Sequence, residues 1–223
     1  MAEGKKVDPA KGHPQNTTKK KRYPHSALYA AAVVAYRALF ATVFRGRIRG
    51  REHIPAGGPV ILMCNHIHAL DPFSLALCAP RRQVHYLAKR ELFTFKLLAA
   101  ILRELHAISV DRGQFDLAAM RECAAVLRAG EVLGIFPEGH RGDGAALGPL
   151  LSGAAVLALR SDAPVVPAFI GGRYSPFHGV KVAVGAPIPV DDLRAKGGRE
   201  AADDFLDRVR AALEGLRAEC GSM

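Results

Sequence analysis

A histidine and a carboxylate lie close together in residues 64–72, and their spacing could support proton transfer. An imidazole that a carboxylate holds through one ring nitrogen can accept a proton from a hydroxyl group through the other nitrogen. His66 is therefore a candidate general base, and Asp71 is a candidate residue to orient it. The nucleophile would be an alcohol of the substrate, because the chain has no serine in a Gly-x-Ser-x-Gly elbow.

The residues around this pair predict a turn from a buried strand into a helix. Residues 59–64 are continuously apolar and follow a glycine pair, which is typical of a strand with both faces covered. Asp71 and Pro72 predict a helix start, with the carboxylate at the N-cap and the proline at the first helical position. His66 would then lie at the carboxyl end of a strand, where open α/β sheets bind ligands.

The same residues allow two other interpretations. Asp71 could serve only as a helix cap, with His66 as an ordinary loop histidine, since short motifs also match by chance. His66, His68 and Asp71 could instead ligate a metal ion, as in zinc hydrolases. The spacing is one residue off the His-x-His-x-Asp-His pattern of metallo-β-lactamase-like enzymes, and Pro72 follows Asp71 in place of the last histidine.

A second polar loop follows another apolar run. Residues 131–136 predict a strand, and the loop after it contains Glu138, Gly139 and Arg141. A guanidinium group can bind an anion through two parallel hydrogen bonds, and glycine lets backbone N–H groups approach the anion. The loop is a candidate phosphate site, and taken alone it fits an ordinary polar turn equally well.

Four motifs in order resemble the glycerolipid acyltransferase family, which includes the 1-acylglycerol-3-phosphate acyltransferases. An Asn-His-x4-Asp motif occupies residues 65–71, and a Phe-Pro-Glu-Gly-x-Arg motif occupies residues 136–141. Residues 89–93, leading to 108–113, resemble the middle motif, and residues 163–167 resemble the last one. The resemblance covers residues 47–189.

The resemblance implies roles for individual residues. His66 corresponds to the general base of the family, and Asp71 to its orienting partner. Lys89, in the middle motif, is implied to bind substrate, and Pro167, in the last motif, is tied to the acyl side. The residues implied to hold the phosphate and glycerol of the acceptor are Arg112, Glu138, Gly139 and Arg141.

The chain departs from the family pattern beside these motifs. His68 and His140 stand where the family commonly has serine or threonine, and Gly142 replaces a common serine. These differences leave the base intact but alter positions that could distinguish the head group of the acceptor. We expect His140 to fill the place of the threonine rather than to add charge.

Composition favours one domain and an anionic partner. A chain of 223 residues with 49% apolar residues suits a single domain with a sizeable core. The net charge of +10 indicates either nucleic acid or an anionic membrane leaflet. Aromatic residues are sparse and no nucleic-acid-binding module is recognisable, so we expect a membrane surface and no nucleic acid. Four cysteines without paired spacing predict reduced thiols in a cytosolic catalytic domain.

Two segments precede the catalytic domain, which we place at residues 46–223. Residues 1–24 are rich in lysine and poor in apolar side chains, which predicts a disordered basic tail. The second segment is residues 25–45, in which residues 26–44 carry Arg37 as their single charge and have basic residues on both sides. They predict a membrane-associated helix lying in the cytoplasmic leaflet, with a single membrane span as the alternative. The protein would then be peripheral or monotopic.

The remaining pattern predicts an α/β fold with a mixed, largely parallel sheet flanked by helices, because strands and helices alternate. The helix expected at 91–105 is apolar nearly all round, which indicates deep burial or contact with lipid. Other helices are expected at 115–129, 152–160 and 199–218, and strands at 83–88, 106–110, 164–170 and 180–184.

The resemblance predicts a membrane-associated O-acyltransferase of phospholipid biosynthesis. It would move an acyl chain from a thioester to the free hydroxyl of 1-acylglycerol-3-phosphate (lysophosphatidic acid) to make phosphatidic acid. Acyl-CoA or acyl carrier protein would be the co-substrate, with no metal and no other cofactor. Glycerol-3-phosphate or another lysophospholipid is the alternative acceptor, and a His/Asp metal-dependent hydrolase is the alternative enzyme. A non-enzymatic binding module would leave the four ordered motifs unexplained.

Overall fold

The structure is a computed structural model that describes residues 23–24, 26–111, 116–142, 144, 146–176 and 178–223. The predicted basic tail lies almost entirely outside the described residues. Arg112 lies outside them as well.

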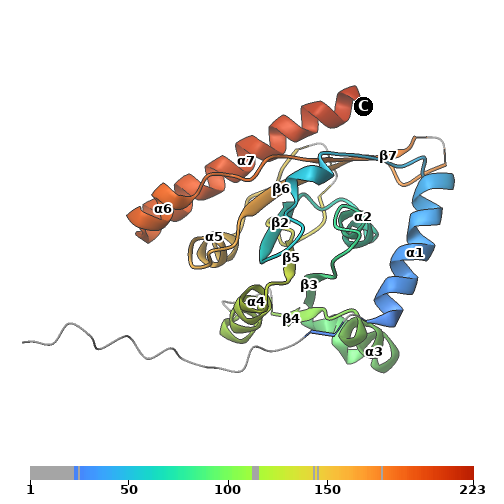
Figure 1. The fold of residues 1–223 in the computed structure, drawn as a ribbon, viewed down its shortest axis with the longest axis horizontal. Helices are drawn as coiled ribbons and strands as arrows, with labels where there is room; N and C mark the ends of the chain where they lie inside the picture. Colours follow the sequence, from blue (N-terminus) through green and yellow to red (C-terminus); the bar gives the residue numbers. More distant parts are fainter. Residues whose placement is uncertain (1–22, 25, 112–115, 143, 145, 177) are drawn as a thin grey trace, which may run out of the picture.

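The described residues form a seven-stranded sheet with the strand order β1-β7-β6-β2-β5-β3-β4 (Figure 1). Every neighbouring pair is parallel except β6 and β7. The predicted α/β fold with a largely parallel sheet is confirmed. The strands are β1 (Arg47–Arg49), β2 (Val60–Cys64), β3 (Val84–Lys89), β4 (Ile108–Val110), β5 (Val132–Ile135), β6 (Val165–Gly172) and β7 (Val180–Val184).

Helices cover both faces of this sheet (Figure 1). One face packs against α4, α5, α6 and α7, and the other against α1 and α2. The helices are α1 (Ala27–Thr42), α2 (Asp71–Ala76), α3 (Lys96–Glu104), α4 (Leu117–Ala129), α5 (Ser152–Leu159), α6 (Asp191–Lys196) and α7 (Gly198–Ser222), with 3-10 turns η1 (Arg51–His53) and η2 (Arg90–Thr94).

The two covered faces explain why β2 is apolar throughout. Ile61 and Met63 point into the layer of α4, α5 and α7, whereas Val60 and Leu62 point into the layer of α1 and α2. Successive side chains of a strand alternate between faces, so a strand buried on both sides needs an unbroken apolar run. All five residues of β2 are buried.

Helix α1 is part of the domain core. Ser26 caps it, since its hydroxyl oxygen accepts the Tyr29 N–H at 3.2 Å. Val33, Tyr36 and Phe40 are buried in the cluster that α1 forms with α2 and the sheet. Within the part of the chain that the structure describes, every helix is too short or too polar to cross a membrane.

The helix expected at residues 91–105 is divided in two. The 3-10 turn η2 ends at Thr94, Phe95 adopts an extended conformation, and α3 begins at Lys96. Deep burial of this helix was one interpretation of its sequence, and it is wrong, because Ala99 is the one residue of α3 that is buried. The exposed apolar side chains of η2, Phe95 and α3 are Leu92, Phe95, Leu97, Leu98 and Ile101.

The short elements β1, η1 and α6 were not predicted. Each has at most six residues and is rich in charged side chains, so it lacks an apolar periodicity. They form because neighbouring elements pair with them or hold them, as β7 does for β1.

A matched pair of glycine substitutions tests the packing of β5 against β3. A Cβ atom on Gly134 would lie 2.4 Å from Cε1 of Tyr86, whose hydroxyl donates to the Pro72 carbonyl at 2.6 Å and so resists displacement. We expect Gly134→Ala to lower the free energy of unfolding by about 1–3 kcal/mol in a urea titration. Gly153→Ala, in α5 with open space around it, should raise it by up to about 1 kcal/mol. Changes of the same sign in both variants would contradict this account.

Candidate active site

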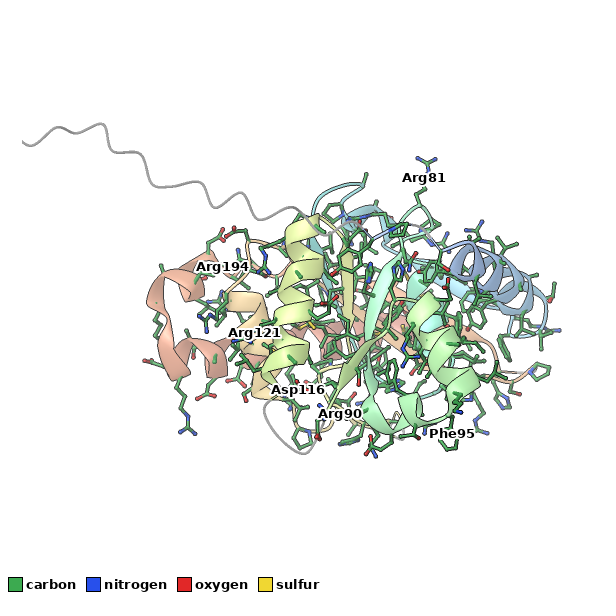
Figure 2. The ribbon with its side chains drawn as sticks, turned by 90° about the horizontal axis from the view of Figure 1, so that it is seen from below. Arg81, Arg90, Phe95, Asp116, Arg121 and Arg194 are labelled. Atoms are coloured by element: carbon green, nitrogen blue, oxygen red, sulfur yellow. The ribbon has the colours of Figure 1, made fainter. Side chains whose placement is uncertain are left out.

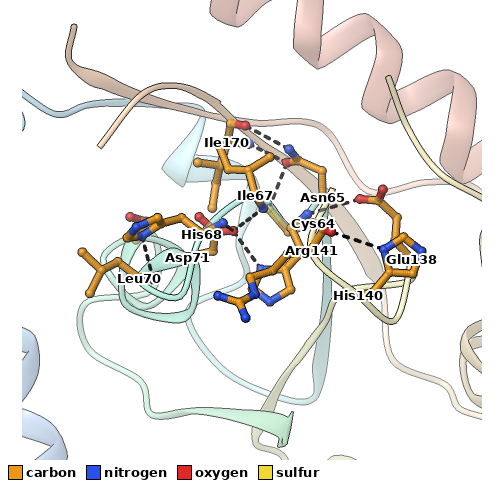
Figure 3. A network of polar contacts seen from close by, with 12 residues as sticks. Cys64, Asn65, Ile67, His68, Leu70, Asp71, Glu138, His140, Arg141 and Ile170 are labelled. Carbon is orange, nitrogen blue, oxygen red and sulfur yellow. Dashed lines mark hydrogen bonds and ion pairs between the residues drawn. The ribbon is translucent and has the colours of Figure 1, made fainter. Parts of the chain in front are cut away.

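The turn that carries His66 is fixed to a neighbouring strand by Asn65. The Asn65 Oδ1 accepts the Ile170 N–H at 2.7 Å, and the Asn65 Nδ2 donates to the Ile170 carbonyl at 2.9 Å (Figure 3). Asn65 is buried, so both hydrogen bonds replace lost contacts with water. The end of β2 is thereby locked to β6 immediately before the histidine.

His66 and Asp71 form the predicted pair. His66 Nδ1 lies 2.8 Å from Asp71 Oδ2, and the aspartate side chain is fully buried. A carboxylate can only accept hydrogen bonds, so His66 Nδ1 carries a proton, and in the neutral form of the ring Nε2 has the free lone pair. Oδ2 also accepts the N–H groups of Ile67 and His68, at 2.6 and 2.7 Å. The short loop thus wraps around the carboxylate and directs one basic nitrogen away from it.

The predicted N-cap role of Asp71 is wrong. Helix α2 begins at Asp71 itself, Leu70 is its N-cap, and no side chain caps it. The carboxylate binds the loop N–H groups that precede it in the chain, so it is not available to the N–H groups of the helix. Pro72 still lies in the first helical turn, as its missing N–H allows.

Two aromatic rings border the pair. The imidazole of His66 stacks on Phe136, with ring centroids 4.2 Å apart and an angle of 21° between the planes. The second Asp71 oxygen, Oδ1, accepts the hydroxyl proton of Tyr174 at 2.6 Å. Burial, followed by the negative charge of Asp71, raises the pKa of Tyr174 far above its usual value, so this hydroxyl stays protonated. Sequence reasoning missed Tyr174, which lies outside the four motifs.

Glu138 connects the second loop to the first. Its Oε1 accepts the His66 N–H at 3.2 Å, and its Oε2 accepts the Gly148 N–H at 2.9 Å. The side chain is buried, with 4% of its surface exposed. Glu138 therefore braces the backbone of the base, and its predicted contact with substrate stays a prediction.

The glycines of this loop allow it to lie close to Leu151 and to the His66 backbone. Gly139 has a φ of +71°, and a Cβ atom there would lie 2.5 Å from Leu151 Cδ1. The Gly142 N–H donates to the His66 carbonyl at 2.7 Å. Together with Glu138, this bond means that the second loop holds both backbone polar groups of His66.

Two basic residues predicted to bind substrate, Lys89 and Arg141, lie at or just after the carboxyl ends of neighbouring strands. Because β2, β5, β3 and β4 are parallel neighbours, their carboxyl ends point the same way. Arg141 is exposed, and its guanidinium has no hydrogen bond or ion pair with the described residues. Lys89 ends β3 and forms an exposed ion pair with Glu91 at 2.9 Å. Arg112 belongs to the segment after β4 that is not described.

Pro167 lies inside β6, opposite Met63 of β2, and is buried. Its carbonyl accepts the Gly185 N–H at 2.9 Å. The structure thus places it in the sheet beside the strand that leads to His66. Its predicted role on the acyl side stays a prediction.

The contacts of the two histidines bear on the metal interpretation. His66 Nδ1 is engaged by Asp71, and His68 Nδ1 accepts the Leu70 N–H at 3.2 Å while its ring stacks on Tyr174. Among the described residues, no three histidine, cysteine or acidic side chains converge on one point. The geometry favours the proton-transfer pair.

The cysteines do not provide a nucleophile. All four are buried and unpaired, as expected for reduced, structural thiols. For Cys64, burial and then the charge of Asp71 raise the pKa well above its usual value. A thiol that stays protonated is a poor nucleophile, so the alcohol of a substrate remains the candidate.

Comparison with known proteins identifies the family. The family model described as Acyltransferase matches residues 45–171, which is more than half of the chain. The chain belongs to the acyltransferase family. The resemblance seen in the sequence is therefore confirmed, and all four motifs of this acyltransferase fall within the matched residues.

Similar proteins carry consistent names. The acyltransferase is 33% identical over 129 residues to the 1-acyl-sn-glycerol-3-phosphate acyltransferase of Bacillus subtilis, over 58% of this chain and 64% of that relative. It is 28% identical over 182 residues to 1-acyl-sn-glycerol-3-phosphate acyltransferase alpha of Bos taurus, over 76% of this chain and 61% of the relative. The chain thus spans less than two thirds of each.

A solved structure supports the fold. The crystal structure of the 1-acyl-sn-glycerophosphate (LPA) acyltransferase PlsC from Thermotoga maritima aligns with a TM-score of 0.64. The alignment covers 85% of this chain and 80% of that chain, at 21% identity. The two chains share their fold, a largely parallel sheet flanked by helices.

Replacement of the bracing carboxylate tests its role. In Glu138→Gln one backbone N–H loses its acceptor, because an amide has a single oxygen. We expect the free energy of unfolding to fall by about 1–3 kcal/mol in a urea titration, as for other buried hydrogen bonds to a charged group. Glu214→Gln, the same change on the exposed face of α7, should leave it unchanged. If both variants have the same free energy of unfolding, the Glu138 hydrogen bonds do not stabilise the site.

Proposed function

We propose that this acyltransferase moves an acyl chain from a thioester to the free hydroxyl of 1-acylglycerol-3-phosphate, making phosphatidic acid for phospholipid biosynthesis. The observation that carries the proposal is the free Nε2 of His66, which the Asp71 contact leaves as a base. The names of the similar proteins support the choice of acceptor. Glycerol-3-phosphate and other lysophospholipids are the alternative acceptors.

The chemistry requires one base and two bound substrates. His66 Nε2 accepts the proton of the acceptor hydroxyl while its oxygen attacks the thioester carbonyl. The new ester C–O bond forms, the C–S bond breaks, and the imidazolium returns the proton to the leaving thiolate. Asp71 stabilises the imidazolium between these steps. Acyl-CoA or acyl carrier protein supplies the acyl group, and the scheme needs no metal ion or further cofactor.

The acceptor phosphate is placed by arginine in this proposal. Arg141 is exposed and lies three residues after Glu138, whose carboxylate is bonded to the His66 backbone. An anion bound by its guanidinium is therefore held on the loop that braces the base. Arg112 is the further cation predicted for this phosphate, and Lys89 is predicted to bind substrate.

Apolar side chains at the surface point to a membrane as the place of reaction. Helices α1 and α3 lie on the same side of the molecule, and Phe95 projects from it (Figures 1 and 2). Phe95 and Leu97 are 67% and 78% exposed, and Val34 of α1 is 66% exposed. Contiguous exposed apolar side chains mark interaction surfaces.

Positive charge lines a hollow that α1 also borders, and Figure 2 shows Arg81 of this hollow far from Phe95. This hollow of about 490 Å³ between α1 and the end of α2 is lined in part by Arg37, Arg51 and Arg81. Guanidinium groups near apolar side chains favour a bilayer with anionic head groups. We therefore propose a peripheral or monotopic position on the cytoplasmic face of a membrane.

The activity test uses purified full-length protein with lysophosphatidic acid and labelled acyl-CoA. We expect the wild-type protein to make labelled phosphatidic acid. His66→Ala should lower kcat at least about 10³-fold, because the acceptor hydroxyl is no longer activated by a general base. Arg141→Ala should raise the KM for the acceptor, and Arg160→Ala, an exposed arginine at the end of α5, should not. Full activity of His66→Ala would refute the assignment of the base. Activity that is lost on chelation would favour the hydrolase alternative.

The membrane proposal is tested by cosedimentation with anionic vesicles. The double variant Phe95→Ser, Leu97→Ser should bind vesicles at least about 30-fold more weakly, since each of the two exposed side chains contributes about 1 kcal/mol or more on insertion. Leu117→Ser removes a leucine of α4 that is half exposed and serves as the control. Binding that is equal in all three proteins would exclude this surface.

A further inference from the structure

Three hydroxyl groups, those of the buried Tyr36 and Ser74 and of the partly buried Tyr174, connect helix α1 to the Asp71 carboxylate. The Tyr36 hydroxyl lies 2.6 Å from Ser74 Oγ, and Ser74 Oγ lies 2.9 Å from the Tyr174 hydroxyl. The Tyr174 hydroxyl lies 2.6 Å from Asp71 Oδ1. Tyr36 belongs to α1, Ser74 to α2, and Tyr174 follows β6. Three separate elements therefore meet at one carboxylate.

The direction of this hydrogen-bond chain is determined by proton counting. The Asp71 carboxylate can only accept hydrogen bonds, so Tyr174 donates its single hydroxyl proton to it. Ser74 must then donate to Tyr174, and Tyr36 must donate to Ser74. All three hydroxyl dipoles point toward Asp71, an arrangement in which each bond strengthens the next.

The chain completes the surroundings of Asp71. Oδ2 is occupied by His66 Nδ1 and two backbone N–H groups, and Tyr174 is the donor to Oδ1. The Tyr174 ring is itself held, because it stacks on His68 at 4.4 Å and meets the edge of Phe44 at 5.5 Å. A fixed donor on Oδ1 prevents rotation of the carboxylate and keeps Oδ2 facing the imidazole.

We propose that Tyr174 is a positioning residue for the His66–Asp71 pair. Through Ser74 and Tyr36, the orientation of this pair then depends on how helix α1 packs. The proposal rests on the proposed role of His66 as the base. Tyr174 disperses part of the Asp71 charge and holds its orientation. Correct docking of α1 then supplies the last donor of the chain.

Few other titratable groups contact this network. Asp71 and Glu138 are the acidic side chains bonded to the His66 residue, the latter through its backbone N–H. His68 faces the Tyr174 ring, and Tyr36 lies at the far end of the chain. These groups, with the exposed Arg141 on the adjoining loop, are unchanged in Tyr174→Phe, so a pH effect of that variant reports on the Tyr174 hydroxyl.

The test compares Tyr174→Phe and Ser74→Ala with Tyr29→Phe. Tyr29 is the matched control, because it is a tyrosine of α1, as Tyr36 is, and its hydroxyl accepts the Val84 N–H instead of joining the hydrogen-bond chain. We expect Tyr174→Phe to lower kcat about tenfold with little change in KM, a smaller effect than that of a full ångström of misplacement. Ser74→Ala should lower kcat less. A Tyr29→Phe variant that lowers kcat as much as Tyr174→Phe would refute the proposal.

The pH profile gives a readout that loss of packing alone would not change. Without the Tyr174 donor, more negative charge faces His66 and favours the imidazolium, which cannot act as a base. The acid limb of the kcat profile should therefore move to higher pH in Tyr174→Phe. An unchanged acid limb in Tyr174→Phe would overturn the proposal.

Proton NMR makes the test independent of turnover. The Nδ1–H resonance of His66, assigned by its loss in His66→Ala, should move to lower field in Tyr174→Phe because its bond to Asp71 strengthens. If the resonance shifts in Tyr174→Phe but the wild type shows no acyl transfer, the positioning role of Tyr174 is supported and the proposed function is refuted. If the wild type transfers the acyl chain but the resonance does not move in Tyr174→Phe, the proposed function is supported and the positioning role is refuted.

Discussion

The buried negative charge of Asp71 is the constraint on which the site depends. A carboxylate removed from water is strongly destabilising unless hydrogen bonds replace its hydration. Here both oxygens accept donors from the loop, from the imidazole and from Tyr174. Each of these donors lies within a few residues of the end of β2 or β6, so the sheet limits its position. The charge that orients the base thus also requires fixed relative positions of α2, the loop before it and the segment after β6.

The parallel sheet converts separated motifs into one site. Strands β2 and β5 are neighbours with their carboxyl ends at the same edge. The loops that follow them therefore lie side by side although they are far apart in the sequence. Asn65 then fastens the first loop to β6, and Glu138 fastens the second loop to the first. The His66 backbone is held from both sides before any substrate arrives, which is the preorganisation that proton transfer needs.

The sequence predicted those features that are local or periodic. The strands and the spacing of His66 and Asp71 were recognisable, since an apolar run or a short motif contains the information. The bracing by Glu138 and the donor Tyr174 were not, because they depend on partners 72 and 103 residues away. Ser74 and Tyr36 looked like ordinary helix residues for the same reason. The break at Phe95 was missed because its apolar neighbours continue the helical pattern while tertiary packing leaves them uncovered.

Polar and apolar side chains have exchanged their usual places in two parts of this molecule. At the carboxyl edge of the sheet, Asn65, Asp71, Ser74 and Glu138 are buried, and hydrogen bonds compensate each of them. On α1 and α3, large apolar side chains are exposed, and water offers them no such compensation. A partner of low polarity that covered these helices would remove that cost, and α1 is also the helix that supplies the Tyr36 hydroxyl. The exposed apolar side chains of α1 and the Tyr36 hydroxyl thus belong to one helix, and the proposed membrane position would link docking to the orientation of the His66–Asp71 pair through α1.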